Sequence, residues 1–316
     1  MIKLFQKTET EKYIIIKILF IKITFKKKSP KSDIDAIVWW IPFRSLRNAI
    51  RNIYYEYFNR INEIADNNSN ILYLKRYIEY LEMSKIVNKE AFTKYKNKYL
   101  SKSIVLIGNG PSAVKYGKNI KNAIHIGVNR AFLLKNIKLD YLFIQDNYNA
   151  GSIFEDVKKH TDKSCVKFYG IVDGNHYNVS MTIPDSYISE VNAVKYIVNP
   201  IDFLSDMQYE ISIFPLGDFG TVTFSALQFI FYTNPKKIYL VGLDTQNNGH
   251  FYNNESSLDI NRIIYGWNRV KYLRDNFYPN TEIISINPVG LKGMFTDIYT
   301  EDGNYYTDED GNKINI

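Results

Sequence analysis

The segment from Ser103 to Ser112 reads Ser-Ile-Val-Leu-Ile-Gly-Asn-Gly-Pro-Ser and predicts a strand, a tight turn and the start of a helix. The apolar run 104–107 suits a strand that is buried on both faces of a parallel sheet. The turn Gly108-Asn109-Gly110 allows the backbone to approach a ligand closely. Pro111 suits the first position of a helix, and Ser112 can cap it. The free N–H groups of such a helix start make this a candidate site for phosphate or another anion.

The same glycines leave two other interpretations open. An ordinary tight connection between a strand and a helix would need them for the turn alone. A dinucleotide fingerprint also fits formally, because Ala113 follows Gly110 at the spacing of the third small residue. However, Pro111 is unusual in that fingerprint, and Asn129-Arg130 stands where an acidic residue that binds ribose is expected, so the sequence argues against NAD.

Polar residues also follow the other predicted strands and open one predicted helix. Because the carboxyl ends of parallel strands meet at one edge of a sheet, we expect these residues to line a common pocket. Together they predict a nucleotide or sugar-nucleotide site. The residues are Asn129 and Arg130 after strand 123–128, Asp146 after strand 141–145, Asp244 after strand 237–243, and Thr221, Val222 and Thr223 at the start of helix 221–232.

Strands alternate with helices between residues 101 and 300. This alternation predicts an α/β fold: a Rossmann-like, mostly parallel sheet with flanking helices. The predicted strands are 104–107, 123–128, 141–145, 166–169, 196–198, 237–243 and 282–286, and the predicted helices are 111–119, 130–135, 221–232 and 259–277.

Composition restricts the class of protein. The chain has 316 residues, of which 45% are hydrophobic and 23% charged, so it is globular and not disordered. Cys165 is the single cysteine, which excludes a disulfide framework and a cysteine zinc site and fits a reducing cytoplasm. The localisation that we expect is therefore cytoplasmic.

Charge separates the N-terminal third from the rest of the chain. Residues 1–100 contain 20 Lys and Arg against 10 Asp and Glu, whereas residues 101–316 contain 20 against 23. The basic excess predicts an anionic partner for residues 1–100, and the alternative is a solvated, lysine-rich helical face. We therefore expect a basic N-terminal extension (1–100), a Rossmann-like domain (101–300) and a polar C-terminal tail (301–316).

The N-terminal extension contains features of a membrane interface. Residues 13–25 are apolar but too short to span a bilayer, and a β-hairpin or an interfacial segment is expected there, followed by lysines 26–28. Trp39 and Trp40 precede several arginines in a helical region that we expect over 34–66. This combination suits a membrane interface and equally suits a helix packed on the main domain. Residues 66–70 predict a turn before a second helix over 71–83. Peripheral attachment to an inner membrane is the partner interpretation that these residues favour over nucleic acid.

Three segments together resemble a known group of enzymes. The segment 107–112 resembles the N-terminal motif of the bacterial CMP-sialic-acid-dependent sialyltransferases of lipooligosaccharide synthesis. Residues 221–244 resemble their nucleotide-binding helix and following strand, and residues 287–291 resemble the end of their last strand. The same signatures occur in pterin-pyrophosphokinase-like proteins and in the flagellin-modifying motility accessory factors. The resemblance covers residues 102–296.

The resemblance implies roles for several residues. A Rossmann-like glycosyltransferase domain would use a CMP-activated, sialic-acid-like donor, and Asn109 and Asn129 would contact the nucleotide. Thr221, with the N–H groups of Val222 and Thr223, would hold the phosphate, where donors aimed at the departing group lower the barrier.

The general base is the point at which this sequence departs from the sialyltransferases. Their catalytic histidine corresponds to Arg262 here. His250 is the nearest histidine and is our first candidate base, with Asp146 as the second candidate for base or metal ligand.

The resemblance therefore implies a glycosyltransferase of surface polysaccharide, lipooligosaccharide or glycoprotein synthesis. Its donor would be a nucleotide sugar and its acceptor a glycan or glycolipid, with no metal site predicted and no cofactor firmly implied. A pterin-type pyrophosphokinase, which would need ATP and Mg²⁺, and a non-catalytic nucleotide-binding module are the alternatives. Self-association is left open.

Overall fold

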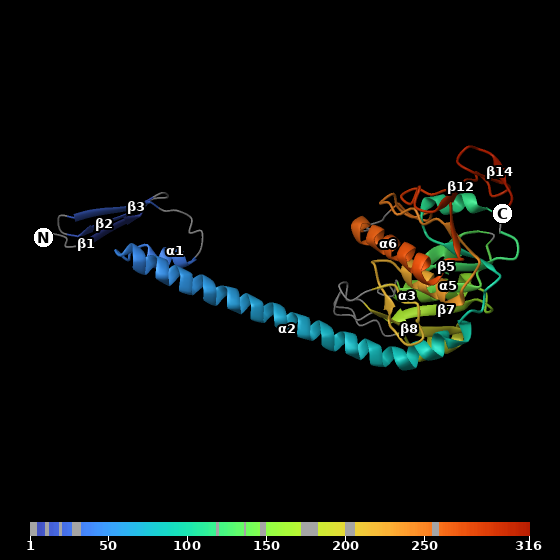
Figure 1. Cartoon of the computed structure of the whole chain (residues 1–316), viewed down its shortest axis with the longest axis horizontal. Coiled ribbons are helices and arrows are strands. Elements are labelled where there is room, and N and C mark those ends of the chain that lie inside the picture. Colours follow the sequence, from blue (N-terminus) through green and yellow to red (C-terminus); the bar gives the residue numbers. More distant parts are fainter. Residues whose placement is uncertain are drawn as a thin grey trace. The chain divides into compact units, whose positions relative to one another are not determined.

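The structure is a computed structural model of the whole chain (Figure 1). It describes residues 5–9, 13–18, 21–26, 33–117, 120–135, 137–145, 150–171, 183–199, 206–254 and 259–316. The chain divides into two compact units, residues 1–72 and 73–316, and the division falls within one helix, α2 (Arg44–Phe92).

The first unit begins with a small antiparallel sheet. The hairpin expected over 13–25 is present as β2 (Tyr13–Ile18) and β3 (Ile21–Lys26), and β1 (Phe5–Glu9) adds a third strand beside β2. The short helix α1 (Asp33–Val38) follows. Ile34 and Val38 of α1 form an apolar cluster with Ile41, against which Ile50 and Tyr54 of α2 pack.

The predicted turn at residues 66–70 is wrong, because α2 runs through it without a break. The segment Asp-Asn-Asn-Ser-Asn contains poor helix formers, but each costs well under about 1 kcal/mol relative to alanine. Neither Gly nor Pro stands there to break the backbone pattern. Weak local preference is therefore overridden by the helical residues on both sides.

Among the residues that the structure describes, the second unit contains a sheet of nine parallel strands. Their order across the sheet is β12-β11-β10-β4-β5-β6-β7-β8-β9, and every strand pair is parallel. This confirms the predicted fold class. The strands are β4 (Ser103–Ile107), β5 (Ile124–Val128), β6 (Tyr141–Ile144), β7 (Val166–Ile171), β8 (Ala193–Asn199), β9 (Leu216–Gly217), β10 (Lys237–Val241), β11 (Glu282–Ile286) and β12 (Thr296–Ile298).

The strand order reverses at one place in the sheet. From β4 the chain proceeds strand by strand to β9 on one side, and it then returns to place β10 on the other side of β4. From β10 it proceeds outward to β11 and β12. In open parallel sheets, ligands bind outside the carboxyl ends of the strands at such a reversal, so the fold itself selects the end of β4 and β10.

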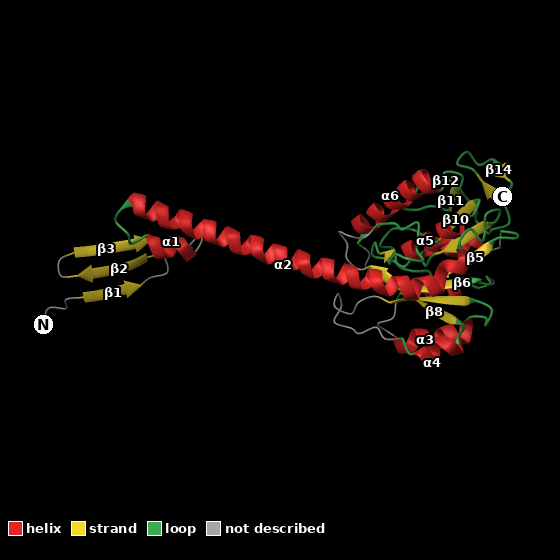
Figure 2. Ribbon diagram, turned by 60° about the horizontal axis from the view of Figure 1, so that its bottom comes forward, coloured by secondary structure: helices red, strands yellow, loops and turns green. Residues whose placement is uncertain are grey.

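Helices and apolar cores cover both faces of the sheet. On one face lie α5 (Thr223–Thr233), which is buried throughout, and α6 (Ile260–Phe277), together with Phe92 of α2 and Tyr95. Stacked rings fill this core; Phe143 and Phe168 have ring centroids 4.6 Å apart. The other face carries η2 (Pro111–Tyr116), η3 (Asn129–Leu133), α3 (Ala150–His160) and α4 (Asp185–Glu190). In the view of Figure 2, α3 and α4 lie below β8 and away from α6.

The C-terminal residues are more ordered than a polar tail. Within the predicted tail 301–316, β13 (Tyr306–Thr307) pairs with β14 (Lys313–Ile314) in a short antiparallel ladder. Tyr306 is buried in the core on the η2 face of the sheet. Its ring therefore fastens this segment to the second unit.

Candidate functional site

The glycines after β4 let two chain segments cross at contact distance. The Gly108 N–H donates to the Val241 carbonyl and the Gly110 N–H to the Gly242 carbonyl, each at 2.8 Å. A Cβ on Gly108 would lie 2.4 Å from the Gly242 oxygen, and one on Gly110 would lie 2.4 Å from the Cγ of Asp244. Both glycines are thus required by packing between the ends of β4 and β10.

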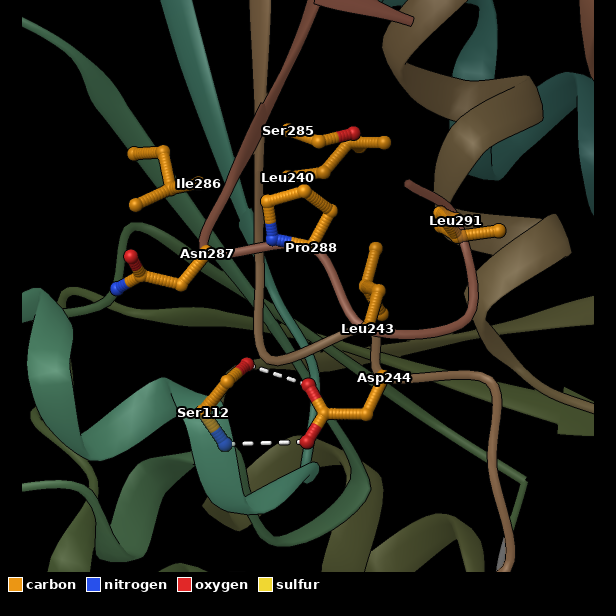
Figure 3. Close-up of a pocket in the computed structure, with 9 residues that line it drawn as sticks. All are labelled: Ser112, Leu240, Leu243, Asp244, Ser285, Ile286, Asn287, Pro288 and Leu291. Carbon is orange, nitrogen blue, oxygen red and sulfur yellow. Dashed lines mark hydrogen bonds between the residues drawn. The ribbon is translucent and has the colours of Figure 1, made fainter. Parts of the chain in front are cut away.

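The carboxylate of Asp244 occupies the start of η2. One of its oxygens accepts a hydrogen bond of 3.1 Å from the Ser112 N–H, and the other accepts from the Ser112 hydroxyl (Figure 3). Asp244 is buried, at 5% exposure. The anion expected at this helix start is therefore, in this structure, a carboxylate of the protein itself.

A small pocket adjoins this pair, between the ends of β10 and β11. It is lined by Ser112, Leu240, Leu243, Asp244, Ser285, Ile286, Asn287, Pro288 and Leu291 (Figure 3). The amide of Asn287 is already used, because its nitrogen donates to the Thr300 carbonyl (2.8 Å) and its oxygen accepts from the Thr300 N–H (2.9 Å). Ser285 also lines this pocket, and sequence analysis missed it. The search considered polar residues that follow a predicted strand, whereas Ser285 lies within β11.

Asn109 lies between Gly108 and Gly110. Its backbone carbonyl holds a neighbouring loop, and its side-chain oxygen is buried without a donor among the described residues. Its carbonyl accepts from the Phe251 N–H at 2.9 Å, which fastens the loop 247–254 to the end of β4. Its side-chain oxygen Oδ1 is buried, and it makes no hydrogen bond with any described residue. A buried acceptor without a donor costs about 1–3 kcal/mol, so this atom is suited to a ligand that supplies a donor.

His250 belongs to that same loop. A tight turn holds it: its N–H donates to the Asn253 carbonyl at 2.7 Å, and its ring stacks on Tyr252 with centroids 5.2 Å apart. The ring is half-buried. The structure therefore places His250 one residue from the contact with Asn109, whereas Asp146, the second candidate base, lies outside the described residues.

Asn129 joins the ends of the next two strands. It adopts a left-handed backbone (φ 44°), and its side-chain oxygen accepts from the Gln145 N–H at 3.2 Å. The Gln145 amide in turn donates to the Ser225 hydroxyl in the first turn of α5 at 3.0 Å. Gln145 and Ser225 were missed by sequence analysis, although Gln145 is the last residue of the predicted strand 141–145.

The start of α5 carries the residues predicted to hold phosphate. The Thr221 hydroxyl oxygen accepts from the Thr223 N–H at 3.4 Å and thus caps part of the helix start. Val222 and Thr223 are buried, at 3% and 5% exposure. Gly220 precedes them with φ 83°. Their role toward a ligand remains a prediction.

Two arginines near these strand ends are engaged in ion pairs. Arg130 pairs with Asp156 of α3 at 2.6 Å, which draws its guanidinium toward that helix. Arg262, in the first turn of α6, lies 3.6 Å from the Asp218 carboxylate and 3.3 Å from where a Cβ on Gly220 would stand. Arg262 therefore places a cation beside the start of α5, a proximity that the sequence did not predict.

Metal-binding residues do not gather in the part of the chain that the structure describes. Within those ranges, no three His, Cys, Asp or Glu side chains lie close enough together to hold an ion. No described helix combines the length and apolarity needed to cross a bilayer.

Comparisons with known proteins find similarity in structure alone. No protein-family model matches the chain, and no curated protein sequence matches it. Among solved structures, the MAf glycosyltransferase from Magnetospirillum magneticum AMB-1 is 14% identical, with a TM-score of 0.41, over 66% of this chain and 37% of that one. The chain thus spans little more than a third of that protein.

Two further solved structures come from Campylobacter jejuni. The monofunctional alpha-2,3-sialyltransferase Cst-I is 15% identical, with a TM-score of 0.40, over 68% of this chain and 87% of that one. The sialyltransferase CstII, solved with the substrate analogue CMP-3FNeuAc, is 12% identical, with a TM-score of 0.35, over 58% and 80%.

Proposed function

We propose that this protein is a glycosyltransferase that takes a sugar from a nucleotide donor. The observation that carries the proposal is the reversal of strand order between β4 and β10, with Asn109, Ser112 and Asp244 at the carboxyl ends of those two strands. In parallel α/β sheets this place binds nucleotides and related ligands. The sequence resemblance favours a CMP-activated, sialic-acid-like sugar over a UDP or GDP sugar.

Asn109 supports the nucleotide part of the proposal. Its buried Oδ1 has no hydrogen-bond donor among the described residues, and a hydroxyl or amino group of the nucleotide would supply one. The carbonyl of the same residue holds the loop that carries His250. One residue would then both contact the donor and position the candidate base.

The reaction would break the bond between the sugar and the nucleotide phosphate and form a bond to an acceptor hydroxyl. The departing phosphate gains negative charge, which the start of α5 with Thr221 would stabilise. The acceptor hydroxyl loses its proton to a base, for which we propose His250 first and Asp146 second. The acceptor would be a glycan or glycolipid of the cell surface or a glycoprotein, and the protein would act in the cytoplasm, at the inner membrane if residues 1–100 bind it.

A thermal-shift panel of CMP, UDP, GDP, ATP with Mg²⁺ and NAD tests the proposal. Selective stabilisation by CMP is the expected result, and it should be lost in Asn109→Ala, because about 1–3 kcal/mol of ligand hydrogen bonding disappears. Asn276→Ala, an exposed amide on α6, is the matched control and should keep the response. Stabilisation by ATP with Mg²⁺ would instead support the pyrophosphokinase, and no response to any nucleotide would contradict a nucleotide-binding role.

A further inference from the structure

The exposed part of α2 carries a line of apolar residues at coiled-coil spacing. Within the first unit, Ile53, Tyr57, Ile64 and Ile71 form this line, and Arg60 and Asn67 are its two polar members. The spacing alternates four and three residues, and it continues in the sequence through Leu74 and Ile78. We call these eight positions the α2 seam. A period of 3.5 residues keeps such a line on one side of a helix that winds around another helix.

No described residue of this chain covers the seam. Every side chain from Tyr55 to Lys75 is exposed, which amounts to more than five helical turns. The apolar members range from 49% exposed at Leu74 to 67% at Ile53. Helices in water derive most of their stability from packing an apolar face, so a helix of this length with a continuous exposed seam needs a partner.

We propose that the α2 seam pairs with the same seam of a second copy of this chain, in parallel and in the same register. Asn67 favours this partner, because an amide both donates and accepts and is satisfied in an apolar seam by an identical amide. Arg60 faces its own copy in that arrangement, but its charge is compensated within each helix by Glu56, 3.1 Å away.

The positions that flank the seam agree with self-pairing. In a parallel pair the flanking residues five apart meet: Glu56 with Ile61, Glu63 with Asn68, and Asn70 with Lys75. None of these pairs opposes like charges. The helix as a whole is close to neutral, with eight Lys and Arg against six Asp and Glu over residues 44–92, which does not provide the basic face of a helix that binds an anionic membrane.

Sedimentation of the full-length protein over a range of concentrations tests the pairing. Two adjacent residues provide a matched comparison, because Ile71 and Leu72 are each 51% exposed but only Ile71 belongs to the seam. We expect a dimer whose dissociation constant rises at least about tenfold in Ile71→Asp and changes less than about twofold in Leu72→Asp. Thermal unfolding of the second unit should be unchanged in both variants.

Disulfide trapping tests the register. Asn67→Cys should give a covalently linked dimer under mild oxidation, whereas Ser69→Cys, on the outer side of the helix, should not. A monomer at about 50 μM, or equal losses in the two Asp variants, would overturn the proposal. Vesicle binding by a monomer that Ile71→Asp abolishes would assign the seam to a membrane instead, and a dimer without Asn67→Cys linkage would overturn the parallel register.

Discussion

Ser112 and Asp244 are 132 residues apart in the sequence and are joined by two hydrogen bonds, from the backbone N–H and the hydroxyl of Ser112 to the two carboxylate oxygens of Asp244. This pair closes the contact between the ends of β4 and β10. It also leaves Gly110 against the Asp244 carboxyl group, with no room for a side chain.

Gly110→Ala should therefore destabilise the protein through a clash with one particular residue. The new Cβ would lie 2.4 Å from the Cγ of Asp244, and overpacking of this kind costs typically about 1–3 kcal/mol. In an Asp244→Ala background the opposing atoms are gone, so the added cost of Gly110→Ala should fall by at least about 1 kcal/mol. Urea unfolding of the native protein, the two single variants and the double variant measures this difference. If the two losses in unfolding free energy simply add, the proposed clash between residue 110 and Asp244 is contradicted.

His250→Ala should lower turnover while leaving CMP affinity nearly unchanged, because the proposed base acts on the acceptor and not on the nucleotide. Loss of a general base typically costs about 10²–10⁴-fold in rate. His160→Ala, an exposed histidine on α3, is the control. Wild-type turnover in His250→Ala would shift the role to Asp146, to be tested by Asp146→Asn.

The buried His125 should make stability fall in mild acid. Burial lowers the pKa of His125, and the charge of Asp140 offsets this in part. The unfolded chain therefore binds the proton more readily, and stability is lost as pH falls below about 6.5 toward the folded pKa. His125→Gln should make the loss of stability below about pH 6.5 less steep, because the substituted side chain binds no proton. An unchanged slope in unfolding experiments would contradict this reading of the buried ring.

The lysine-rich N-terminal segment should bind anionic vesicles if residues 1–100 attach the protein to a membrane. Replacing Lys26, Lys27 and Lys28 with Gln should weaken binding at low salt by about 1 kcal/mol per lysine. The weakening should shrink as salt screens the charges. Lys138→Gln, in the second unit, is the control. If the native chain ignores such vesicles at low salt, the basic excess belongs to a solvated surface.

Much of the parallel sheet was predictable, because most of its strands contain short runs of β-branched, aliphatic or aromatic residues. The short strands β9 and β12 contain no such run and were not predicted. The run 104–107 lies within β4, and 282–286 coincides with β11. The predicted strand 237–243 is two residues too long, because Gly242 takes a positive φ of 63° and turns the chain toward Asp244. Apolar content alone does not reveal at which residue the backbone leaves the extended conformation for a positive φ.

The strand order and the contacts that depend on it were not predictable. Asp244 was expected at a strand end, but its pairing with Ser112 follows from the placement of β10 beside β4, which nothing local to either segment encodes. The link from Asn129 through Gln145 to Ser225 has the same origin. Sequence patterns identified which residues stand at strand ends, and only the topology decides which of them become neighbours.

The reversal of strand order also determines the sequence of events during synthesis. As the chain leaves the ribosome, β4 to β9 are available before β10 exists, and the 132 residues between Ser112 and Asp244 take about 7 to 26 s to translate at 5–20 residues per second. During that time one edge of β4 has no strand beside it, although Ile104 to Ile107 are fully buried in the finished protein. An open apolar edge is a template for mispairing with other chains. β4, an interior strand of the mature sheet, is thus open to mispairing along one edge while the protein is being made.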